Sequence, residues 1–217
     1  MRILSQIFSF FALLLLRDEW NEFKKMLIYS YSAYEKSNYI PPLLAQKLLI
    51  SGEDHRFFQH GGVDLIAICR VVWRRVISGK HEGASTIEMQ IVRIISGRFE
   101  LTLRRKVREM ALATLLTRVI PKDRLPAFYL HIGYYGWHMN GFKDACKYLR
   151  LNLDSLSHIE ASRLVARLKY PQPHYVTLSR LNQIIGRGEY LSCLYLKHQS
   201  GKVYSGLHNL IISYETI

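Results

Sequence analysis

TLRRKVREMALATLLTRVI, residues 102–120, is the longest helical pattern in the chain, and Pro121 ends it. In such a helix Arg105 and Glu109 are i,i+4 neighbours, and Lys106 and Glu109 are i,i+3 neighbours. The pattern therefore predicts one carboxylate within a cationic face, which suits a pyrophosphate group. A solvated ladder of surface ion pairs is the commoner explanation of such a string, and the spacing alone leaves both interpretations open.

Helical patterns also occupy both flanks of this segment, whereas alternating strand patterns are nearly absent. We predict further helices over residues 41–53, 64–78, 85–96, 123–132 and 157–171. Irregular, glycine-rich connections are expected around residues 51–63, 79–84 and 133–141. The residues themselves thus predict a mostly α fold.

Cap residues mark several of these helix ends. Asp64 is the expected N-cap of its helix, and Gly79 is the expected terminator. Two segments, Ser85–Glu88 and Ser157–Glu160, have the spacing of a capping box, in which each side chain bonds the backbone N–H of the other residue. Each predicts the start of a helix.

Length and composition limit the class of protein. The 217 residues suffice for one domain with a buried core, and 49% hydrophobic with 22% charged residues excludes disorder as a description of the whole. The net charge of +13 predicts an anionic partner such as phosphate, nucleic acid or a lipid headgroup surface. Residues 101–150 contain ten Lys and Arg but three Asp and Glu, so much of this charge is concentrated there. The cysteines, Cys69, Cys146 and Cys193, are isolated from one another, so neither a disulfide framework nor a thiolate zinc site is expected.

The most apolar stretch is ILSQIFSFFALLLL, residues 3–16, between Arg2 and Arg17. It is shorter than the roughly 20 residues of a full transmembrane helix. No small-x-small cleavage site follows it, so an uncleaved anchor or an interfacial helix is favoured over a removed signal peptide. A buried core helix is the alternative. For an anchor, Arg2 favours a cytoplasmic N-terminus with the remainder of the chain outside.

Residues 53–64, EDHRFFQHGGVD, combine a carboxylate pair, aromatic residues and two glycines in a predicted loop. Loops on a helical scaffold are natural places for function, and Glu53 can serve there as a general base. The alternative is an exposed, inert acidic pair near a helix end. His55 and His60 are five residues apart and do not share a helical face, so a metal site is not favoured and any metal ligands stay unknown.

Residues 83–90, GASTIEMQ, place a glycine and two hydroxyl residues at a predicted helix start. Free backbone N–H groups and the positive end of the helix dipole can bind phosphate there. A plain capping box explains the same pattern, so this segment alone does not decide between the two.

In their order and spacing, these three clusters resemble glycosyltransferase family 51, the peptidoglycan glycosyltransferase domain of penicillin-binding proteins and of monofunctional transglycosylases. The first family motif, E-D-x-x-F-x-x-H-x-G, matches at Glu53, Asp54, Phe57, His60 and Gly62. The second, G-x-S-T-[IL]-x-Q-Q, matches at Gly83, Ser85, Thr86, Ile87 and Gln90. The third, R-K-x-x-E, matches at Arg105, Lys106 and Glu109. Weaker similarity continues through Lys122 and Tyr129, and the resemblance covers about residues 40–190.

The resemblance implies an architecture and a reaction. The architecture is a lysozyme-like helical lobe with a smaller membrane-associated lobe, within a domain at residues 18–190. A short apolar anchor or interfacial helix at residues 1–17 precedes this domain, and a tail of unknown role at 191–217 follows it. The reaction is polymerisation of lipid II into β-1,4-linked glycan with release of undecaprenyl pyrophosphate. A transpeptidase domain is not expected, which corresponds to a monofunctional form.

The resemblance also implies roles for single residues. Glu53 aligns with the general base that deprotonates the acceptor 4-hydroxyl, and Glu109 aligns with the second carboxylate, beside the leaving pyrophosphate. Arg93, Arg105 and Lys106 would surround the phosphates. The full set of implied substrate-binding residues is Asp54, Phe57, His60, Gly62, Ser85, Thr86, Gln90, Arg93, Arg105 and Lys106.

Cofactors, partners and location follow from the same resemblance. No cofactor is required, and a divalent cation, Mg or Mn, at the pyrophosphate is left open. The implied partners are lipid II, the growing glycan strand, the membrane surface and other cell-wall synthesis proteins, but not nucleic acid. The implied location is the bacterial inner membrane, with the catalytic domain extracytoplasmic.

Several family positions are changed in this chain, namely at Met89, Arg93, Ile94, Leu101, Ala127 and His131. Leu101 removes a cation from the implied phosphate site, for which Arg98 or Arg104 can compensate. The alternatives are therefore a weakened or non-catalytic relative that binds lipid-linked glycan, or a transferase with a different lipid-pyrophosphate sugar. A lysozyme-like hydrolase is a further alternative, because two carboxylates in a cleft also suit glycoside cleavage. A nucleic-acid-binding module is disfavoured, because no helix-turn-helix, RNP or zinc pattern is present.

Overall fold

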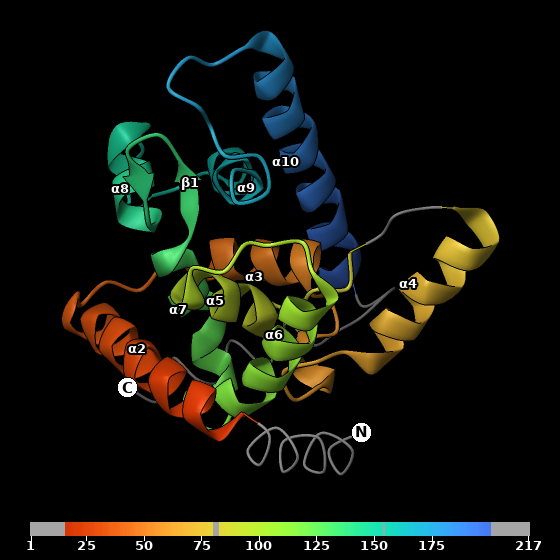
Figure 1. The fold of residues 1–217 in the computed structure, drawn as a ribbon. Helices are drawn as coiled ribbons and strands as arrows, with labels where there is room; N and C mark the ends of the chain where they lie inside the picture. Colours follow the sequence, from red (N-terminus) through yellow and green to blue (C-terminus); the bar gives the residue numbers. More distant parts are fainter. Residues whose placement is uncertain (1–15, 80–82, 154, 201–217) are drawn as a thin grey trace. The chain divides into compact units, whose positions relative to one another are not determined.

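The computed structural model describes residues 16–79, 83–153 and 155–200. Backbone contacts divide the chain into two compact units, and each is described by itself. The first unit consists of Met1–Ala33 and Arg56–Leu125, and the second of Tyr34–His55 and Pro126–Ile217. Most of the described residues are helical, which confirms the predicted mostly α class (Figure 1).

The first unit contains most of α2 and the helical elements between Arg56 and Leu125. Its elements are α2 (Arg17–Lys36), η1 (Phe57–Gln59), α4 (Leu65–Ser78), α5 (Ile87–Ser96), α6 (Leu103–Leu116) and η2 (Lys122–Arg124). The second unit contains α3 (Leu43–Glu53), α7 (Leu125–Ile132), β1 (Tyr134–Gly136), β2 (Met139–Asn140), α8 (Phe142–Tyr148), α9 (His158–Ala166) and α10 (Leu178–Gln199).

Two of the predicted capping arrangements are present in the structure. The Asp64 carboxylate accepts hydrogen bonds from the first backbone N–H groups of α4, and Gly79 ends that helix in the left-handed conformation. The capping box Ser157–Glu160 opens α9, with both reciprocal bonds formed. These predictions are confirmed because the bonds connect residues that are neighbours in the sequence.

The capping box predicted at Ser85–Glu88 is wrong. Thr86, not Ser85, is the N-cap of α5, and its hydroxyl accepts a hydrogen bond from the Met89 N–H at 3.2 Å. Glu88 does not bond back to the helix start, because its side chain is buried and forms an ion pair with Lys122 at 2.6 Å. Burying a carboxylate without a cation costs more free energy than omitting the second bond of a capping box.

Helix boundaries and some whole elements also differ from the prediction. The helix predicted over 102–120 ends at Leu116, where the following N–H groups of Arg118 and Val119 bond carbonyls three residues back. Helices α2, α8 and α10 and the short β1–β2 hairpin were not predicted. Helix α10 continues past residue 190, the predicted end of the domain, into the predicted tail at 191–217, and residues 201–217 lie outside the described part.

The predicted anchor at residues 1–17 lies, except for its last two residues, outside the described part of the chain. Among the residues that the structure does describe, no helix has the length and apolar character needed to cross a bilayer.

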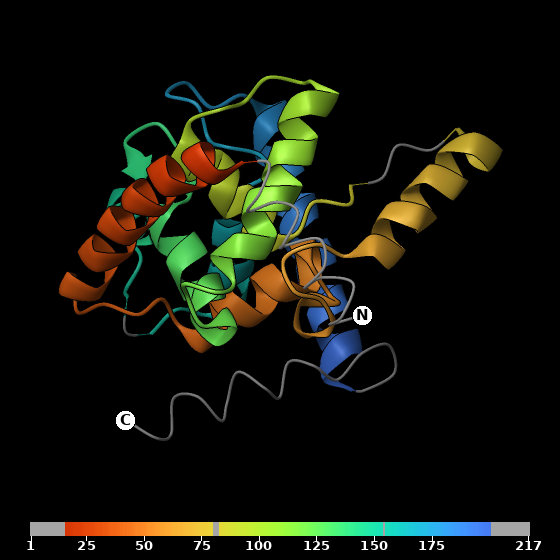
Figure 2. The same ribbon diagram turned by 60° about the horizontal axis from the view of Figure 1, so that its bottom comes forward.

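The interior of the first unit lies between α5 and α6, which pack against each other. Both helices bury one apolar face, and the fully buried side chains include Ile87, Met89, Ile91, Ala113, Leu115 and Leu116. Helix α4 stands apart from these two helices in both ribbon views (Figure 1 and Figure 2).

Gly62 sits against the backbone of α6 in the first unit. Its φ is 98°, and a Cβ added there would overlap the carbonyl oxygen of Ala113. Its own carbonyl accepts a hydrogen bond from the Thr86 hydroxyl at 2.7 Å. Glycine is therefore required at this position both for its conformation and for the close approach.

The interior of the second unit lies among α3, α9 and α10. Apolar side chains of all three helices are buried there, including Leu48, Leu49, Leu164, Ile184 and Leu191. The β1–β2 hairpin is held by backbone hydrogen bonds to Gln172. The Trp137 N–H donates to the Gln172 carbonyl at 2.8 Å, and the Gln172 N–H donates to the Tyr135 carbonyl at 3.0 Å.

We expect Gly62→Ala to lower the free energy of unfolding by about 3 kcal/mol, because the new methyl group overlaps α6 in addition to straining the backbone. Gly79→Ala is the matched control, since Gly79 also has a positive φ (62°) but no heavy atom within 4 Å of an added Cβ. It should cost only about 1 kcal/mol. Urea unfolding of both variants measures the difference, and equal losses would contradict the packing role of Gly62.

Candidate functional site

Glu109 lies on the buried side of α6, and three cations contact its carboxylate. Arg93 of α5 reaches it through Nε at 2.7 Å and Nη2 at 3.2 Å. Arg105 also bonds it through Nη1, and Lys106 Nζ lies 3.6 Å from Oε2. The residue is 2% exposed. The spacing prediction for α6 is therefore confirmed, whereas the alternative of a solvated surface ladder is wrong.

Lys106 connects this cluster to the start of α5. Its ammonium group donates a hydrogen bond to the Ser85 hydroxyl at 2.7 Å. Burial lowers the pKa of Lys106, and the nearby guanidinium groups of Arg93 and Arg105 lower it further, while Glu109 opposes both effects. The cluster thus holds one anion against three cations, and one of these cations loses its proton more readily than an ordinary lysine.

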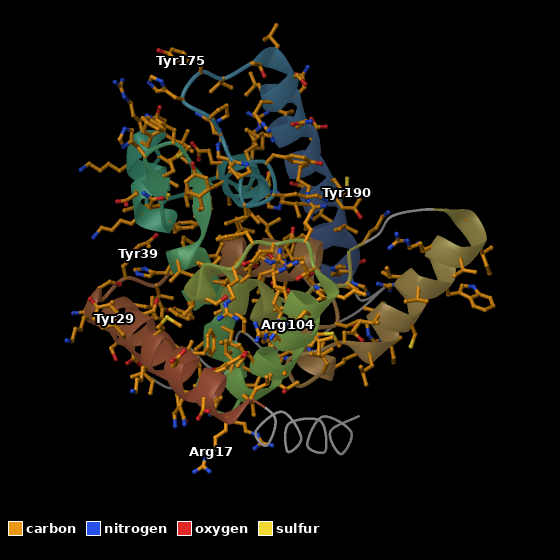
Figure 3. All side chains as sticks on the ribbon, viewed as in Figure 1. Arg17, Tyr29, Tyr39, Arg104, Tyr175 and Tyr190 are labelled. Carbon is orange, nitrogen blue, oxygen red and sulfur yellow. The ribbon has the colours of Figure 1, made fainter. Side chains whose placement is uncertain are left out.

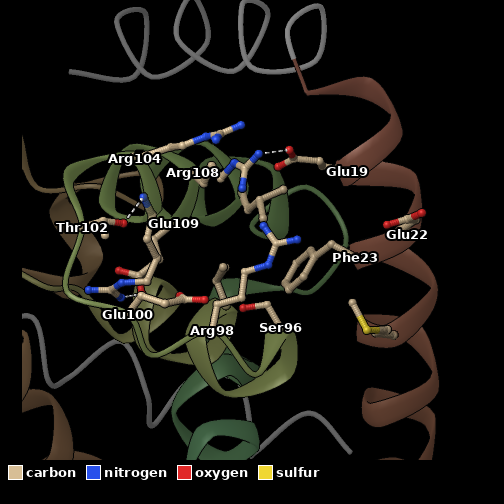
Figure 4. A pocket seen from close by; sticks show the side chains of 14 residues that line it. Glu19, Glu22, Phe23, Ser96, Arg98, Glu100, Thr102, Arg104, Arg108 and Glu109 are labelled. Carbon is tan, nitrogen blue, oxygen red and sulfur yellow. Dashed lines mark hydrogen bonds and ion pairs between the residues drawn. The ribbon is translucent and has the colours of Figure 1, made fainter.

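A cavity of about 290 Å³ adjoins this cluster within the first unit. Figure 4 shows Glu109 among the side chains that line it, with Arg108 paired to Glu19 of α2 at 2.5 Å. Its lining combines an apolar part with charged residues from α2, α5, α6 and the connection between the last two helices. Four arginines and four glutamates line it, so its charges are balanced, and of the Glu109 cluster only Glu109 and Arg105 are among the lining residues.

The changed position Leu101 does not line this cavity, and its side chain is 96% exposed. Arg98 and Arg104, which the sequence offered as compensating cations, both line it together with Arg105. Figure 4 shows Arg98 and Arg104 at separate positions around Glu109. Arg98 and Arg104 therefore bring positive charge to this cavity, whereas the change at Leu101 does not alter its lining.

The predicted substrate-binding residues of the first unit fall into two groups. Ser85, Arg93, Arg105 and Lys106 gather around Glu109, and Gln90 lies part-exposed on α5. The others support the fold of the unit. Those are Thr86 and Gly62, which bond each other, and Phe57 and His60, which are buried.

A second buried acid, Glu88, forms part of this supporting group. Lys122 donates to its carboxylate at 2.6 Å and to the His60 carbonyl at 2.6 Å, and its ammonium lies 4.3 Å from the centre of the Phe57 ring. Burial acts to raise the pKa of Glu88, but Lys122 and His60 outweigh it, so the pKa is lowered. This role of Glu88 was not predicted, since no local pattern in the sequence connects it to Lys122.

Glu53 and Asp54 lie in the second unit, at the end of α3. Arg187 of α10 donates from Nη2 to the Glu53 carboxylate at 2.7 Å and to the Gly52 carbonyl at 3.0 Å. Asp54 is buried and caps α3 through its backbone N–H. Glu53 is thus a partly exposed, ion-paired carboxylate rather than the fully exposed acid of the alternative interpretation. Arg187 was missed, because its position in the sequence gives no sign of this contact.

Of the remaining changed positions, two are buried and two, Ile94 and His131, are part-exposed. Met89 and Ala127 are fully buried, so they alter packing rather than the surface of the cavity. The ring of His131 lies 5.1 Å from that of Tyr34. Burial lowers the pKa of His131, against the opposing charge of Asp144.

Comparison with known proteins places this geometry in context. A family model described as "Transglycosylase" matches residues 21–191. Penicillin-binding protein 1A of Rickettsia bellii is 30% identical over 148 residues, which is 64% of this chain and 19% of that protein. Penicillin-binding protein 1A of Neisseria gonorrhoeae is 32% identical over 135 residues, which is 61% of this chain and 17% of that protein. Each match spans less than a fifth of the relative's length.

Because the pKa of Lys106 lies below the ordinary lysine value of 10.5, we expect this residue to lose its charge as the pH rises before other lysines do. Binding of inorganic pyrophosphate should weaken over the same range. Lys106→Arg keeps the charge, so the loss should move to higher pH. Calorimetric titration at a series of pH values tests this, with Lys25→Arg on α2 as the control. An unchanged pH profile in Lys106→Arg would rule out Lys106 as the titrating group.

Proposed function

Since the chain belongs to the transglycosylase family, we propose that it is a peptidoglycan glycosyltransferase that polymerises lipid II into β-1,4-linked glycan and releases undecaprenyl pyrophosphate. The observation that carries the proposal is the buried Glu109 carboxylate with Arg93, Arg105 and Lys106 around it. Three cations against one anion leave an excess of positive charge in this cluster, and Glu109 and Arg105 of the cluster also line the adjoining cavity. Such an excess stabilises the negative charge that grows on a leaving pyrophosphate.

In the proposed reaction, the acceptor 4-hydroxyl oxygen attacks the anomeric carbon of the donor sugar. The bond from that carbon to the pyrophosphate oxygen breaks, and its electron pair leaves with the pyrophosphate. Glu53 takes the proton of the attacking hydroxyl as general base. Its partial exposure supports this role, because a base must reach a proton on the substrate.

The changed positions are compatible with an active enzyme. Met89 and Ala127 are buried in the core, and Leu101 does not line the cavity, to which Arg98 and Arg104 contribute cations. Both carboxylates and the cations around Glu109 are retained. The weakened or non-catalytic alternative therefore has no specific observation in its favour.

The residues around Glu109 do not suit a bound metal ion. Its carboxylate already has three cationic partners, and a further cation would be repelled by them. We therefore derive no step through a Mg or Mn ion, and the proposal requires no cofactor.

Membrane association is part of the proposal and is supported by α4. This helix exposes a run of large apolar side chains, namely Leu65, Ile66, Val72, Trp73, Val76 and Ile77. Exposed apolar runs of this size mark interaction surfaces, and the arginines Arg74 and Arg75 on the same helix favour anionic headgroups. The proposed location is the bacterial inner membrane, with the catalytic part outside the cytoplasm. Other cell-wall synthesis proteins are proposed partners.

Polymerisation of purified lipid II, followed on gels, tests the proposed reaction. Glu53→Gln should lower the rate by at least roughly 100-fold, since no base then takes the proton. Glu109→Gln should lower it by roughly 100-fold or more, because the cations lose the anion that orders them. Glu35→Gln, an exposed acid on α2, is the control and should polymerise normally. Wild-type rates in either of the first two variants would contradict the proposed roles.

Sedimentation with phosphatidylglycerol vesicles tests the role of α4. Trp73, 68% exposed, and Val76, 80% exposed, should bury apolar surface in the bilayer. We expect the double change Trp73→Glu and Val76→Glu to weaken vesicle binding at least about tenfold. The control is Trp137→Glu, which alters an exposed tryptophan of the second unit. If the control reduced binding as much, α4 would not be the membrane surface.

A further inference from the structure

We infer that Arg187 is a positioning residue that holds the general base Glu53 in its reactive orientation. The inference rests on the proposed function, in which Glu53 takes the proton from the acceptor hydroxyl. The two residues are 134 positions apart in the sequence, and both belong to the second unit.

The contact fixes the carboxylate relative to the helix that carries it. The same nitrogen, Nη2 of Arg187, donates to Glu53 Oε1 at 2.7 Å and to the carbonyl oxygen of Gly52 at 3.0 Å. The side chains are 11% exposed for Arg187 and 20% exposed for Glu53, so solvent screens the pair only in part. A nitrogen that holds both the backbone and the carboxylate restricts the rotation of the glutamate.

The packing of the second unit brings Arg187 to this place. A Cβ on Gly52 would overlap the side chain of Leu191 of α10, so a larger residue at this position would force that side chain to move. Gly188 lets α10 lie close to Arg163 of α9, where an added Cβ would be 3.3 Å from a backbone nitrogen. The guanidinium also lies 5.2 Å from the ring centre of Tyr190. Figure 3 shows Tyr190 on α10.

Arg187 lowers the stability of the fold in a way that packing alone does not explain. Its Nε is buried, and no acceptor for it is present among the residues that the structure describes. An unsatisfied buried donor lowers stability, and an apolar side chain of similar volume would avoid that loss. The hydrogen bond from Nη2 of Arg187 to the Glu53 carboxylate accounts for a guanidinium at this position.

The chemistry separates the role of Arg187 from that of the base. A guanidinium has donors but no acceptor, so it cannot take the proton from the hydroxyl. It acts through Glu53, by holding the carboxylate where the substrate hydroxyl arrives. Misplacing a reacting group by about 1 Å can lower a rate by roughly 100-fold, so a positioning residue has a measurable effect on turnover.

The test measures kcat and KM for lipid II polymerisation and the melting temperature of each variant. We expect Arg187→Met to lower kcat roughly 10- to 100-fold while KM changes less than about twofold. Arg187→Lys should recover part of that loss, since an ammonium can still bond the carboxylate. The control is Arg180→Met, which removes an arginine from the first turn of the same helix. The Arg180 guanidinium lies over the ring of Tyr170, and this variant should leave kcat unchanged.

A double-mutant cycle distinguishes positioning from a general structural effect. In the Glu53→Gln background, Arg187→Met should change the residual rate less than about twofold, because the residue acts through the base that has been removed. A further loss as large as in the wild-type background would overturn the inference. If Arg187→Met does not fold, Arg187→Gln is put through the same cycle and judged by the same criteria.

The outcomes separate this inference from the function on which it rests. Polymer from the wild type together with normal kcat in Arg187→Met overturns the inference alone. No polymer from the folded wild type overturns the proposed function, and the role of Arg187 with it. A loss of kcat in Arg187→Met that disappears in the Glu53→Gln background supports both.

Discussion

The buried charge of Glu109 constrains the whole of the first unit. A carboxylate that is 2% exposed costs several kcal/mol unless cations and hydrogen bonds compensate it. Two of the compensating cations come from the helix that carries Glu109, but Arg93 comes from α5. Helices α5 and α6 must therefore pack in the one arrangement that brings Arg93 to this carboxylate. The packing of the unit and the cation cluster of the proposed site are thus consequences of the same requirement.

The second buried acid, Glu88, imposes the same requirement on the other side of α5. Lys122 compensates its charge and also bonds the His60 carbonyl, so it joins η2 and the loop after η1 to α5. Separating this ion pair would leave a buried carboxylate without its cation, so the pair favours one arrangement of these segments. One helix thus has a buried ion pair on each side, which makes its position well determined. This explains why several motif residues of the first unit support the fold and do not contact the cavity.

The sequence predicted the features that depend on near neighbours. The pairs Arg105–Glu109 and Lys106–Glu109 and the cap at Asp64 follow from helical spacing, and the structure contains them. Contacts between distant segments were not predictable, because no spacing rule links residues that meet only after packing. The capping box at Ser85–Glu88 failed for the same reason, since a distant lysine determines where Glu88 lies. Helix α10 was missed because Gly186 and Gly188 weaken a helical pattern, although Gly188 permits its packing against α9.

The two carboxylates of the proposed mechanism have environments that suit different tasks. Glu109 has three cationic partners, and its side chain is 3% exposed, so it is an internal part of a cation cluster and has little access to substrate protons. Glu53 has Arg187 as a cationic partner and is 20% exposed, which leaves it accessible to a hydroxyl group. Acid–base chemistry with two carboxylates depends on environments that differ in this way. The difference supports Glu53 as the proton acceptor and Glu109 as the residue that orders the cations for a leaving pyrophosphate.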